Sequence, residues 1–171
     1  MPLKGVKVLE LGSLIAGPYA SALLAQFGAE VIKVEPPKDG DPLRKWRKLH
    51  DGTSLWWYTQ SRNKKSVTLD LKADEARDIV RRLTHDVDIV IENFRPGTLE
   101  KWGLGWEHLS ALNPRLIMVR ISGYGQSGPY RPSRHRAEAE RNAGTDSLGG
   151  SATRRAHPGS AGVGGHRRES L

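Results

Sequence analysis

Residues 6–35 read VKVLELGSLIAGPYASALLAQFGAEVIKVE, and the rest of the architecture can be worked out from this segment. It begins with a short β-branched run, residues 6–11, and ends with a second apolar run, residues 29–35. Between them a glycine-bearing loop leads into an Ala- and Leu-rich helix, expected over residues 18–27 with Gly28 as its left-handed cap. A strand, a helix and a strand in about thirty residues make one βαβ unit, whose two strands should be parallel.

The alternation of strand and helix recurs further along the chain. We expect strands over residues 66–71, 87–91 and 116–121, a helix over residues 73–84, and short helices over residues 99–102 and 106–112. The longest of these helices has acids in its first turn and arginines in its last, the charge order that the helix dipole favours. The fold class is therefore predicted as α/β, with a Rossmann-like open, mostly parallel sheet and flanking helices.

The sequence changes character after Tyr130. The 171 residues carry 27 Lys and Arg against 19 Asp and Glu, a net charge of +8, and the last 41 residues alone hold 8 arginines and 4 acids. Those residues also include seven glycines but only three members of the Val, Ile, Leu, Met, Phe, Trp and Tyr group. Such a composition cannot bury enough apolar surface to fold. We expect residues 1–130 to form the α/β part and residues 131–171 to be a disordered basic tail.

Composition excludes several classes of protein. The chain has no cysteine, which excludes disulfides, thiol catalysis and Cys-based zinc sites. Its six histidines show no metal-ligand spacing, so we predict no metal site. No apolar run approaches the roughly 18 residues that a membrane-spanning helix needs, and the N-terminus lacks the apolar centre of a secretory signal. We expect a soluble, cytoplasmic protein.

Ligands of an open parallel sheet bind at the carboxyl ends of its strands, so the loops after residues 11, 91 and 121 are the candidate sites. The first loop has the Gly-x-x-x-x-Gly spacing of a phosphate loop, but Pro18-Tyr19 stands where Lys-Ser/Thr is required, which excludes a nucleoside triphosphatase. The Gly-x-Gly-x-x-Gly dinucleotide motif is absent there, and the third loop lacks the Gly-x-Ser-x-Gly of hydrolases. What remains in the first loop is a set of small residues before a helix start, which suits an anion.

The second loop carries three side chains that could bind a ligand. Asn93 can hydrogen-bond a polar group, Phe94 can stack on a flat ring, and Arg95 can pair with phosphate. The alternative interpretation is a turn that only leads into the next helix, with Arg95 in solvent. The local sequence favours neither interpretation over the other.

The connection between residues 35 and 65 is long, polar and rich in aromatic residues, namely Trp46, Trp56, Trp57 and Tyr58. We favour packing on its own domain over a ligand role, because a loop of this length is either functional or held down. It ends in a basic cluster made of Arg62, Lys64 and Lys65. That cluster could hold phosphates, but charge clusters more often face water, and we expect the same here.

Taken in order, the segments of this chain resemble one family. The segments that carry the resemblance are residues 3–10, 16–18, 28–35, 63–66, 69–72, 92–97 (ENFRPG), 113–117 (NPRLI) and 123–125 (GYG). Together they look like the family III coenzyme A (CoA) transferases, which include formyl-CoA and carnitine CoA-transferases and the α-methylacyl-CoA racemases. The resemblance covers residues 3–130.

The resemblance implies a function. Members of this family move CoA from an acyl-CoA to a small carboxylic acid, through an aspartate that forms a mixed anhydride and then a thioester with CoA. It implies interlocked homodimers without a membrane anchor. The residues that match the family's CoA-binding positions are Ile15, Ala16, Leu69, Lys72, Asn93, Phe94, Arg95 and Lys101. Lys72, Arg95 and Lys101 would offer positive charge to the phosphates, while Leu69 and Phe94 would offer apolar surface to adenine.

The family's catalytic aspartate follows a glycine, well downstream of the Gly-Tyr-Gly loop. Asp146 follows Thr145 and comes too soon, and Glu169 is the wrong residue, so we assign no catalytic residue. We therefore expect a truncated chain that is inactive as written. A reading-frame shift near residues 131–134 is one hypothesis for the change of character, and sequencing the coding DNA tests it.

The sequence leaves three other interpretations open. The chain could be a CoA-binding module without catalysis or a fragment of an acyl-CoA racemase. It could also be a basic protein whose tail binds nucleic acid non-specifically and in a salt-dependent way. We rank nucleic-acid binding last, because no aromatic residue follows Tyr130 and base stacking is therefore not available to the tail.

Overall fold

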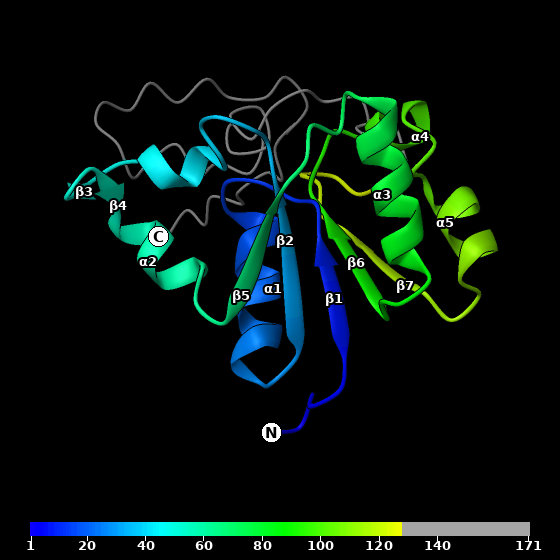
Figure 1. Cartoon of the computed structure of the whole chain (residues 1–171), viewed down its shortest axis with the longest axis horizontal. Coiled ribbons are helices and arrows are strands. Elements are labelled where there is room, and N and C mark those ends of the chain that lie inside the picture. The colour runs from blue at the N-terminus through cyan, green and yellow to red at the C-terminus, as the bar shows by residue number, and fades with distance from the viewer. Residues whose placement is uncertain (128–171) are drawn as a thin grey trace, which may run out of the picture. The chain divides into compact units, whose positions relative to one another are not determined.

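The structure, a computed structural model, describes residues 1–127, so the tail expected over residues 131–171 and the proposed frameshift lie outside the described residues. Five strands form one sheet: β1 (Lys7–Glu10), β2 (Glu30–Glu35), β5 (Lys64–Thr68), β6 (Ile89–Glu92) and β7 (Ile117–Arg120). Their order is β5-β2-β1-β6-β7 and every pairing is parallel (Figure 1). The predicted open parallel α/β sheet is confirmed. The order reverses between β1 and β6, which is where such sheets bind ligands.

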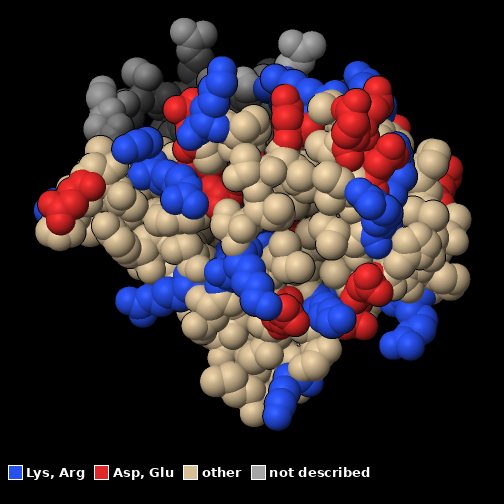
Figure 2. Space-filling model, in the orientation of Figure 1, with Lys and Arg blue, Asp and Glu red and all other residues tan. Residues whose placement is uncertain are grey.

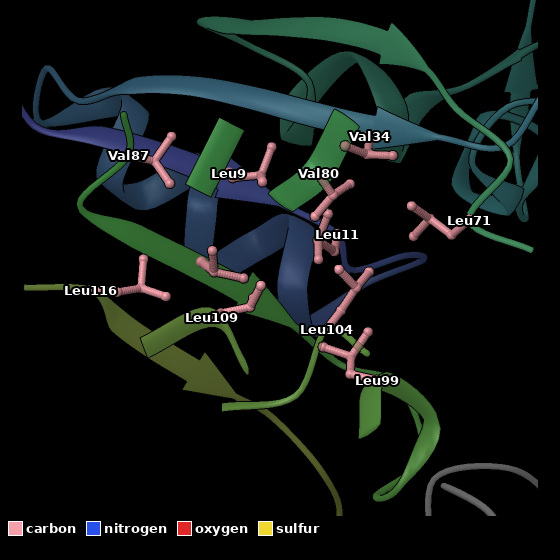
Figure 3. Close-up of a cluster of buried hydrophobic side chains, with 11 residues drawn as sticks. Leu9, Leu11, Val34, Leu71, Val80, Val87, Leu99, Leu104, Leu109 and Leu116 are labelled. Atoms are coloured by element: carbon pink, nitrogen blue, oxygen red, sulfur yellow. The ribbon is translucent and has the colours of Figure 1, made fainter. Parts of the chain in front are cut away.

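Outside residues 36–63, the helices that connect these strands are α1 (Ala16–Gln26), α3 (Asp74–Thr84), α4 (Thr98–Lys101) and α5 (Trp106–Leu112). Helix α1 lies on one face of the sheet and α3 on the other (Figure 1). On the α3 face, Leu9 of β1 and Leu11, which follows that strand, join Val80 of α3 in a cluster of buried apolar side chains (Figure 3). On the α1 face, Val8 joins Ala25 of α1 in a second, smaller cluster. The alternation of side chains along β1 thus supplies both cores.

The predicted boundaries differ from the structure by a few residues. Helix α1 begins at Ala16 rather than at Pro18, and Gly28 has the expected left-handed φ of 103°. Strand β5 begins at Lys64 and ends at Thr68, whereas the sequence predicted residues 66–71. This shift matters for function, because it places Lys64 inside the sheet, in register with Val31 of β2.

Residues 36–63, here called the side lobe, contain structure that the sequence analysis did not predict. Its elements are the 3-10 helix η1 (Pro42–Lys45), the hairpin of β3 (Leu49–His50) and β4 (Thr53–Ser54), and helix α2 (Leu55–Gln60). The rings of Trp46 and Trp56 meet edge to face with centroids 5.7 Å apart, and the Arg44 guanidinium lies 3.9 Å from the centre of the Trp57 ring. The three tryptophans thus make contacts within the lobe, whereas Trp56 and Tyr58 remain 44% and 46% exposed.

Lys, Arg, Asp and Glu side chains are interspersed on the face seen in Figure 2, so that no broad area of one sign covers it. Within residues 1–127, no group of three or more Asp, Glu or His side chains is placed to hold a metal ion. Nor does any helix in that part of the chain have the length and apolar character needed to cross a membrane.

Candidate functional site

The carboxyl ends of β1 and β6 lie side by side, with Glu10 in register with Ile91. The loops that follow them pack so tightly that two glycines are required. A Cβ atom on Gly12 would lie 2.7 Å from Oδ1 of Asn93, and one on Gly17 would lie 3.1 Å from the same oxygen. These contacts explain the Gly-x-x-x-x-Gly spacing of the first loop: the glycines make room for Asn93, which follows β6.

Asn93 fastens the first loop to the second. Its Oδ1 accepts a hydrogen bond from the Ser13 amide at 2.8 Å, and its Nδ2 donates to the Ser13 carbonyl at 2.9 Å. Both ends of the side-chain amide are therefore used within the protein. Asn93 thus fixes the loop on which Ile15 and Ala16 lie, and its hydrogen bond to a ligand stays a prediction.

Leu14, the next residue of the loop, has a left-handed backbone with φ of 67°. For a residue other than glycine this conformation costs roughly 1–2 kcal/mol, so it needs support from neighbouring groups. The support comes from Asp41 at the start of η1, whose carboxylate accepts a hydrogen bond from the Leu14 amide at 3.0 Å. Asp41 is almost fully buried, and it also accepts a hydrogen bond from the Leu43 amide at 2.8 Å.

A buried network of charges lies beneath this loop, on the α1 face of the sheet. Lys33 of β2 places its Nζ 2.6 Å from Oε1 of Glu10 and 2.6 Å from Oδ2 of Asp41. Lys64 of β5 places its Nζ 2.8 Å from Oε2 of Glu10. All four side chains are at least 97% buried, and two ammonium groups balance two carboxylates. This balance is what allows the charges to remain away from water.

The two lysines of this network also donate hydrogen bonds to backbone carbonyls of the loop and of the first turn of α1. Nζ of Lys33 donates a hydrogen bond to the Gly12 carbonyl at 3.1 Å, and Nζ of Lys64 donates to the Pro18 carbonyl at 2.6 Å. Desolvation lowers the pKa of Lys64, an effect that the charge of Glu10 partly offsets. The expectation that Lys64 faces water is therefore wrong, whereas Lys65 beside it is exposed and pairs with Glu30.

A second buried carboxylate ties β2 to the side lobe. Glu35 accepts hydrogen bonds from Arg44 at 2.7 and 2.9 Å, from Ser66 at 2.5 Å and from the Asp41 amide at 2.9 Å. Burial alone would raise the pKa of Glu35, but these hydrogen bonds outweigh it and lower that pKa to about 2. The side lobe is thus attached to the sheet by a permanently ionised group at neutral pH.

The loop after β6 rests on a third buried carboxylate. Glu92 accepts hydrogen bonds from the Phe94 amide at 2.7 Å and from Nε of Arg120 at 2.8 Å. Arg120, on β7, also pairs with Glu100 of α4 at 2.6 Å. Burial raises the pKa of Glu92, against the opposing effect of Arg120. These contacts fix the backbone that carries Phe94 and Arg95.

The structure places the eight predicted CoA-binding residues in segments that follow β1, β5 and β6 or at the end of α4: Ile15, Ala16, Leu69, Lys72, Asn93, Phe94, Arg95 and Lys101. Ile15 is the N-cap of α1, and its side chain accepts no hydrogen bond from the first amides of the helix. Lys72, Arg95 and Lys101 are exposed. Leu69 and Phe94 are half-buried against the α3-face cluster, and the Phe94 ring meets Trp102 edge to face at 5.4 Å. Phe94 is thus held in place by packing.

Sequence analysis missed the residues that hold this edge together, which are Glu10, Lys33, Glu35, Asp41 and Glu92. A signal was present: four of the five are charged residues inside, or at the end of, short apolar strands. Charged residues in a sheet covered on both faces are almost always paired. Asp41 had no such signal, because it lies in the side lobe, whose elements are short.

The model of the family "CoA-transferase family III" matches residues 3–160. The chain belongs to CoA-transferase family III. It is 63% identical over 131 residues to succinyl-CoA–D-citramalate CoA-transferase of Chloroflexus aurantiacus, an alignment that covers 76% of this chain and 33% of that protein. It is 39% identical over 130 residues to formyl-CoA:oxalate CoA-transferase of Escherichia coli, covering 75% and 31%.

Solved structures in the family show the same architecture. The crystal structure of a CAIB/BAIF family protein from Brucella suis superposes with a TM-score of 0.78 at 39% sequence identity, covering 95% of this chain and 44% of that one. This CoA-transferase family III chain spans about a third of the length of the curated relatives it matches. The sequence-based assignment to the family is therefore confirmed.

Proposed function

We propose that this chain supplies the CoA-binding part of a CoA-transferase, which moves CoA from an acyl-CoA to a small carboxylic acid. The observation that carries the proposal is the match to CoA-transferase family III, because it covers residues 3–160 and so includes all eight predicted CoA-binding residues. Their positions, at the carboxyl edge next to the β1 and β6 reversal, fit a nucleotide-like ligand.

The side chains at this edge fit the chemistry of CoA. Its phosphates carry negative charge, and the α1 N-terminus offers backbone amides beside Ile15 and Ala16. The ammonium groups of Lys72 and Lys101 are exposed and can approach phosphate oxygens. The half-buried side chains of Leu69 and Phe94 present apolar surface on the same edge. When bound, CoA supplies the thiol that forms the thioester.

The residues of this chain would bind and orient CoA. Asn93 and the two glycines keep the first loop close to the second, so that the α1 N-terminus stays open at the sheet edge. Glu92 and Arg120 do the same for the loop that carries Arg95. We leave the catalytic residue unassigned. We further propose a homodimeric assembly, and succinyl-CoA as the first donor to test, because the Chloroflexus relative carries that acyl-CoA in its name.

Calorimetric titration of the full 171-residue chain with CoA tests the proposal, with circular dichroism showing that the chain is folded. Saturable binding that weakens with added salt supports it, because phosphate contacts are screened by ions. The Lys72→Ala and Lys101→Ala variants should each weaken binding. Lys4→Ala is the matched control, since Lys4 is an exposed lysine ahead of β1, away from the carboxyl edge. A folded chain that does not bind CoA would overturn the proposal.

A separate assay tests transfer itself. The chain is incubated with succinyl-CoA and a labelled small dicarboxylic acid, and the exchange of CoA onto the labelled acid, with release of succinate, is followed. Exchange would show that the chain is an active CoA-transferase. CoA binding without exchange would favour the binding module without catalysis.

A further inference from the structure

The first loop and the start of α1 are hydrogen-bonded at four residues by side chains from four separate segments of the chain. Lys33 of β2 holds the Gly12 carbonyl, Asn93 after β6 holds Ser13, and Lys64 of β5 holds the Pro18 carbonyl. The fourth point is the Leu14 amide, held by Asp41 of the side lobe. Ile15 and Ala16, which the proposed function places against CoA, lie between these points.

The hydrogen bond to the Leu14 amide differs from the other three contacts to this loop. The left-handed φ of 67° at Leu14 is a conformation that a leucine rarely adopts, so it persists only where other contacts enforce it. The Asp41 carboxylate is the group that bonds the Leu14 amide. Without this contact, Leu14 would relax toward negative φ and the next two residues would change direction.

Asp41 is itself held in a fixed orientation. Its Oδ1 accepts the Leu43 amide at 2.8 Å, and its Oδ2 faces Nζ of Lys33 at 2.6 Å. The amide of Asp41 donates to Oε2 of Glu35 at 2.9 Å. Both carboxylate oxygens are therefore engaged, and the side chain cannot rotate without breaking an ion pair inside the protein. Burial of the Asp41 charge is costly, and the ion pair with Lys33 offsets that cost.

We propose that Asp41 is a positioning residue for CoA binding: its carboxylate holds the Leu14 amide and thereby fixes the backbone that presents Ile15 and Ala16 to the ligand. The inference rests on the proposed function for the identity of the ligand. It adds a role for the side lobe, which carries none of the eight predicted CoA-binding residues. The lobe acts on the site through one carboxylate.

Amide hydrogen exchange on the unmodified full-length chain gives a first test that does not depend on CoA. The Leu14 amide should exchange at least tenfold more slowly than the Ala16 amide, because within residues 1–127 an acceptor is found for the former and none for the latter. Equal exchange at the two positions would overturn the proposal. Because this measurement involves no CoA, its outcome separates a failure of the Asp41 proposal from a failure of the proposed CoA-binding function.

Affinity for CoA gives the second test, using Asp41→Ala with Asp39→Ala as the matched control, since Asp39 is an exposed aspartate two residues away. Asp41→Ala should weaken CoA binding about tenfold or more, the loss expected for one hydrogen bond to a charged group. Asp39→Ala should bind like the unmodified chain. Unchanged affinity in a folded Asp41→Ala protein would overturn the proposal.

A rescue variant separates positioning from a general loss of structure. Glycine adopts the left-handed conformation without strain, so Leu14→Gly combined with Asp41→Ala should recover several-fold of the lost CoA affinity. The same change should not recover the thermal stability lost with Asp41, because the Lys33 ion pair stays broken. Recovery of stability without recovery of affinity would show that Asp41 has only a structural role. If Asp41→Ala does not fold, the exchange measurement on the unmodified chain decides the matter.

Discussion

The two faces of the sheet are built from the same strands and yet by opposite means. On the α3 face, Leu9 of β1 and Val34 of β2 belong to one apolar cluster (Figure 3). One residue away on the same strands, Glu10 and Lys33 meet as a buried ion pair under α1 and the side lobe. Packing on the apolar face depends only on the shape and volume of the side chains. Ion pairing on the charged face requires each charged group to lie at a set distance from its partner.

The two faces of the sheet have separate roles. Apolar contacts are non-directional and stabilise the fold wherever they form. Ion pairs and hydrogen bonds are directional, so the charged face can fix a loop, and it lies beneath the loop that leads into α1. We therefore expect the charged face to define the site and the apolar face to define the stability, and the following changes test this division.

The largest effect should come from Glu10→Ala. It leaves the buried ammonium groups of Lys33 and Lys64 short of a carboxylate, which typically lowers the free energy of unfolding by about 3–5 kcal/mol. Urea denaturation followed by circular dichroism measures the change. Glu30→Ala is the control, because Glu30 lies on the neighbouring strand with its partner Lys65 in solvent, and it should leave the stability unchanged. A loss no greater than that of the control would contradict the role given to the network.

Leu9→Ala tests the apolar face and should cost about 3 kcal/mol, the usual cost of a cavity at a fully buried leucine. The same urea titration measures it, with Leu23→Ala as the control, since Leu23 of α1 is 38% exposed. In contrast to Asp41→Ala, Leu9→Ala should leave CoA affinity unchanged in the folded protein. A parallel fall in affinity would show that the two faces are not separable in function.

A pH titration of stability should show the contribution of Glu35. Its pKa is about 2 in the folded protein and near 4.5 when unfolded, so its ionised form stabilises the fold fully above pH 4.5. That stabilisation, on the order of 3 kcal/mol, should disappear as the pH falls from 4.5 to 2. Glu35→Gln should remove this part of the pH dependence, and the exposed Glu75→Gln should retain it. An identical acid profile in both variants would refute the assignment.

The smallest effect on stability should come from substitutions on the exposed side of α1, which carries large apolar side chains. Tyr19, Leu23 and Phe27 are spaced four residues apart and are 54%, 38% and 54% exposed. Leu23→Lys and Phe27→Lys should change the free energy of unfolding by no more than about 0.5 kcal/mol. They should nevertheless reduce self-association of the chain, measured by sedimentation velocity. Gln26→Lys adds the same charge to the same helix and should not reduce self-association. Equal self-association of all three variants would contradict an apolar contact between chains through this side of α1.

The sequence was sufficient for the α/β class because each strand is a short apolar run between turn signals, as residues 6–11 illustrate. It was insufficient for the side lobe, whose 3-10 helix and two-residue strands are too short for hydrophobic periodicity to register. It placed Ile15, Ala16 and Arg95 at the correct edge of the sheet. Their roles as CoA contacts remain a prediction.

The network escaped prediction for a physical reason. Alternation of apolar and charged residues, as in residues 30–35, usually indicates a strand with one face in water. Here Lys33 and Glu35 are buried while Glu30 is exposed, and the partners of Lys33 come from β1 and from Asp41. Pairing across distant segments of the chain is not encoded in local pattern, so the charges of Lys64 and Glu10 could be found only once the strands were aligned.

The strand order has a consequence for how the chain acquires its structure. Strand β1 occupies the centre of the sheet, yet its two neighbours are made at very different times: Leu9 pairs with Ile32 on one side and with Val90 on the other. During synthesis the half formed by β1, β2 and β5 can assemble first, carrying its ion network and the contact from Asp41. The contact from Asn93 to Ser13 closes the loop only after β6 has emerged from the ribosome. A nascent chain arrested before β6 would thus have the contacts to the loop from β2, β5 and Asp41 but lack the contact from Asn93.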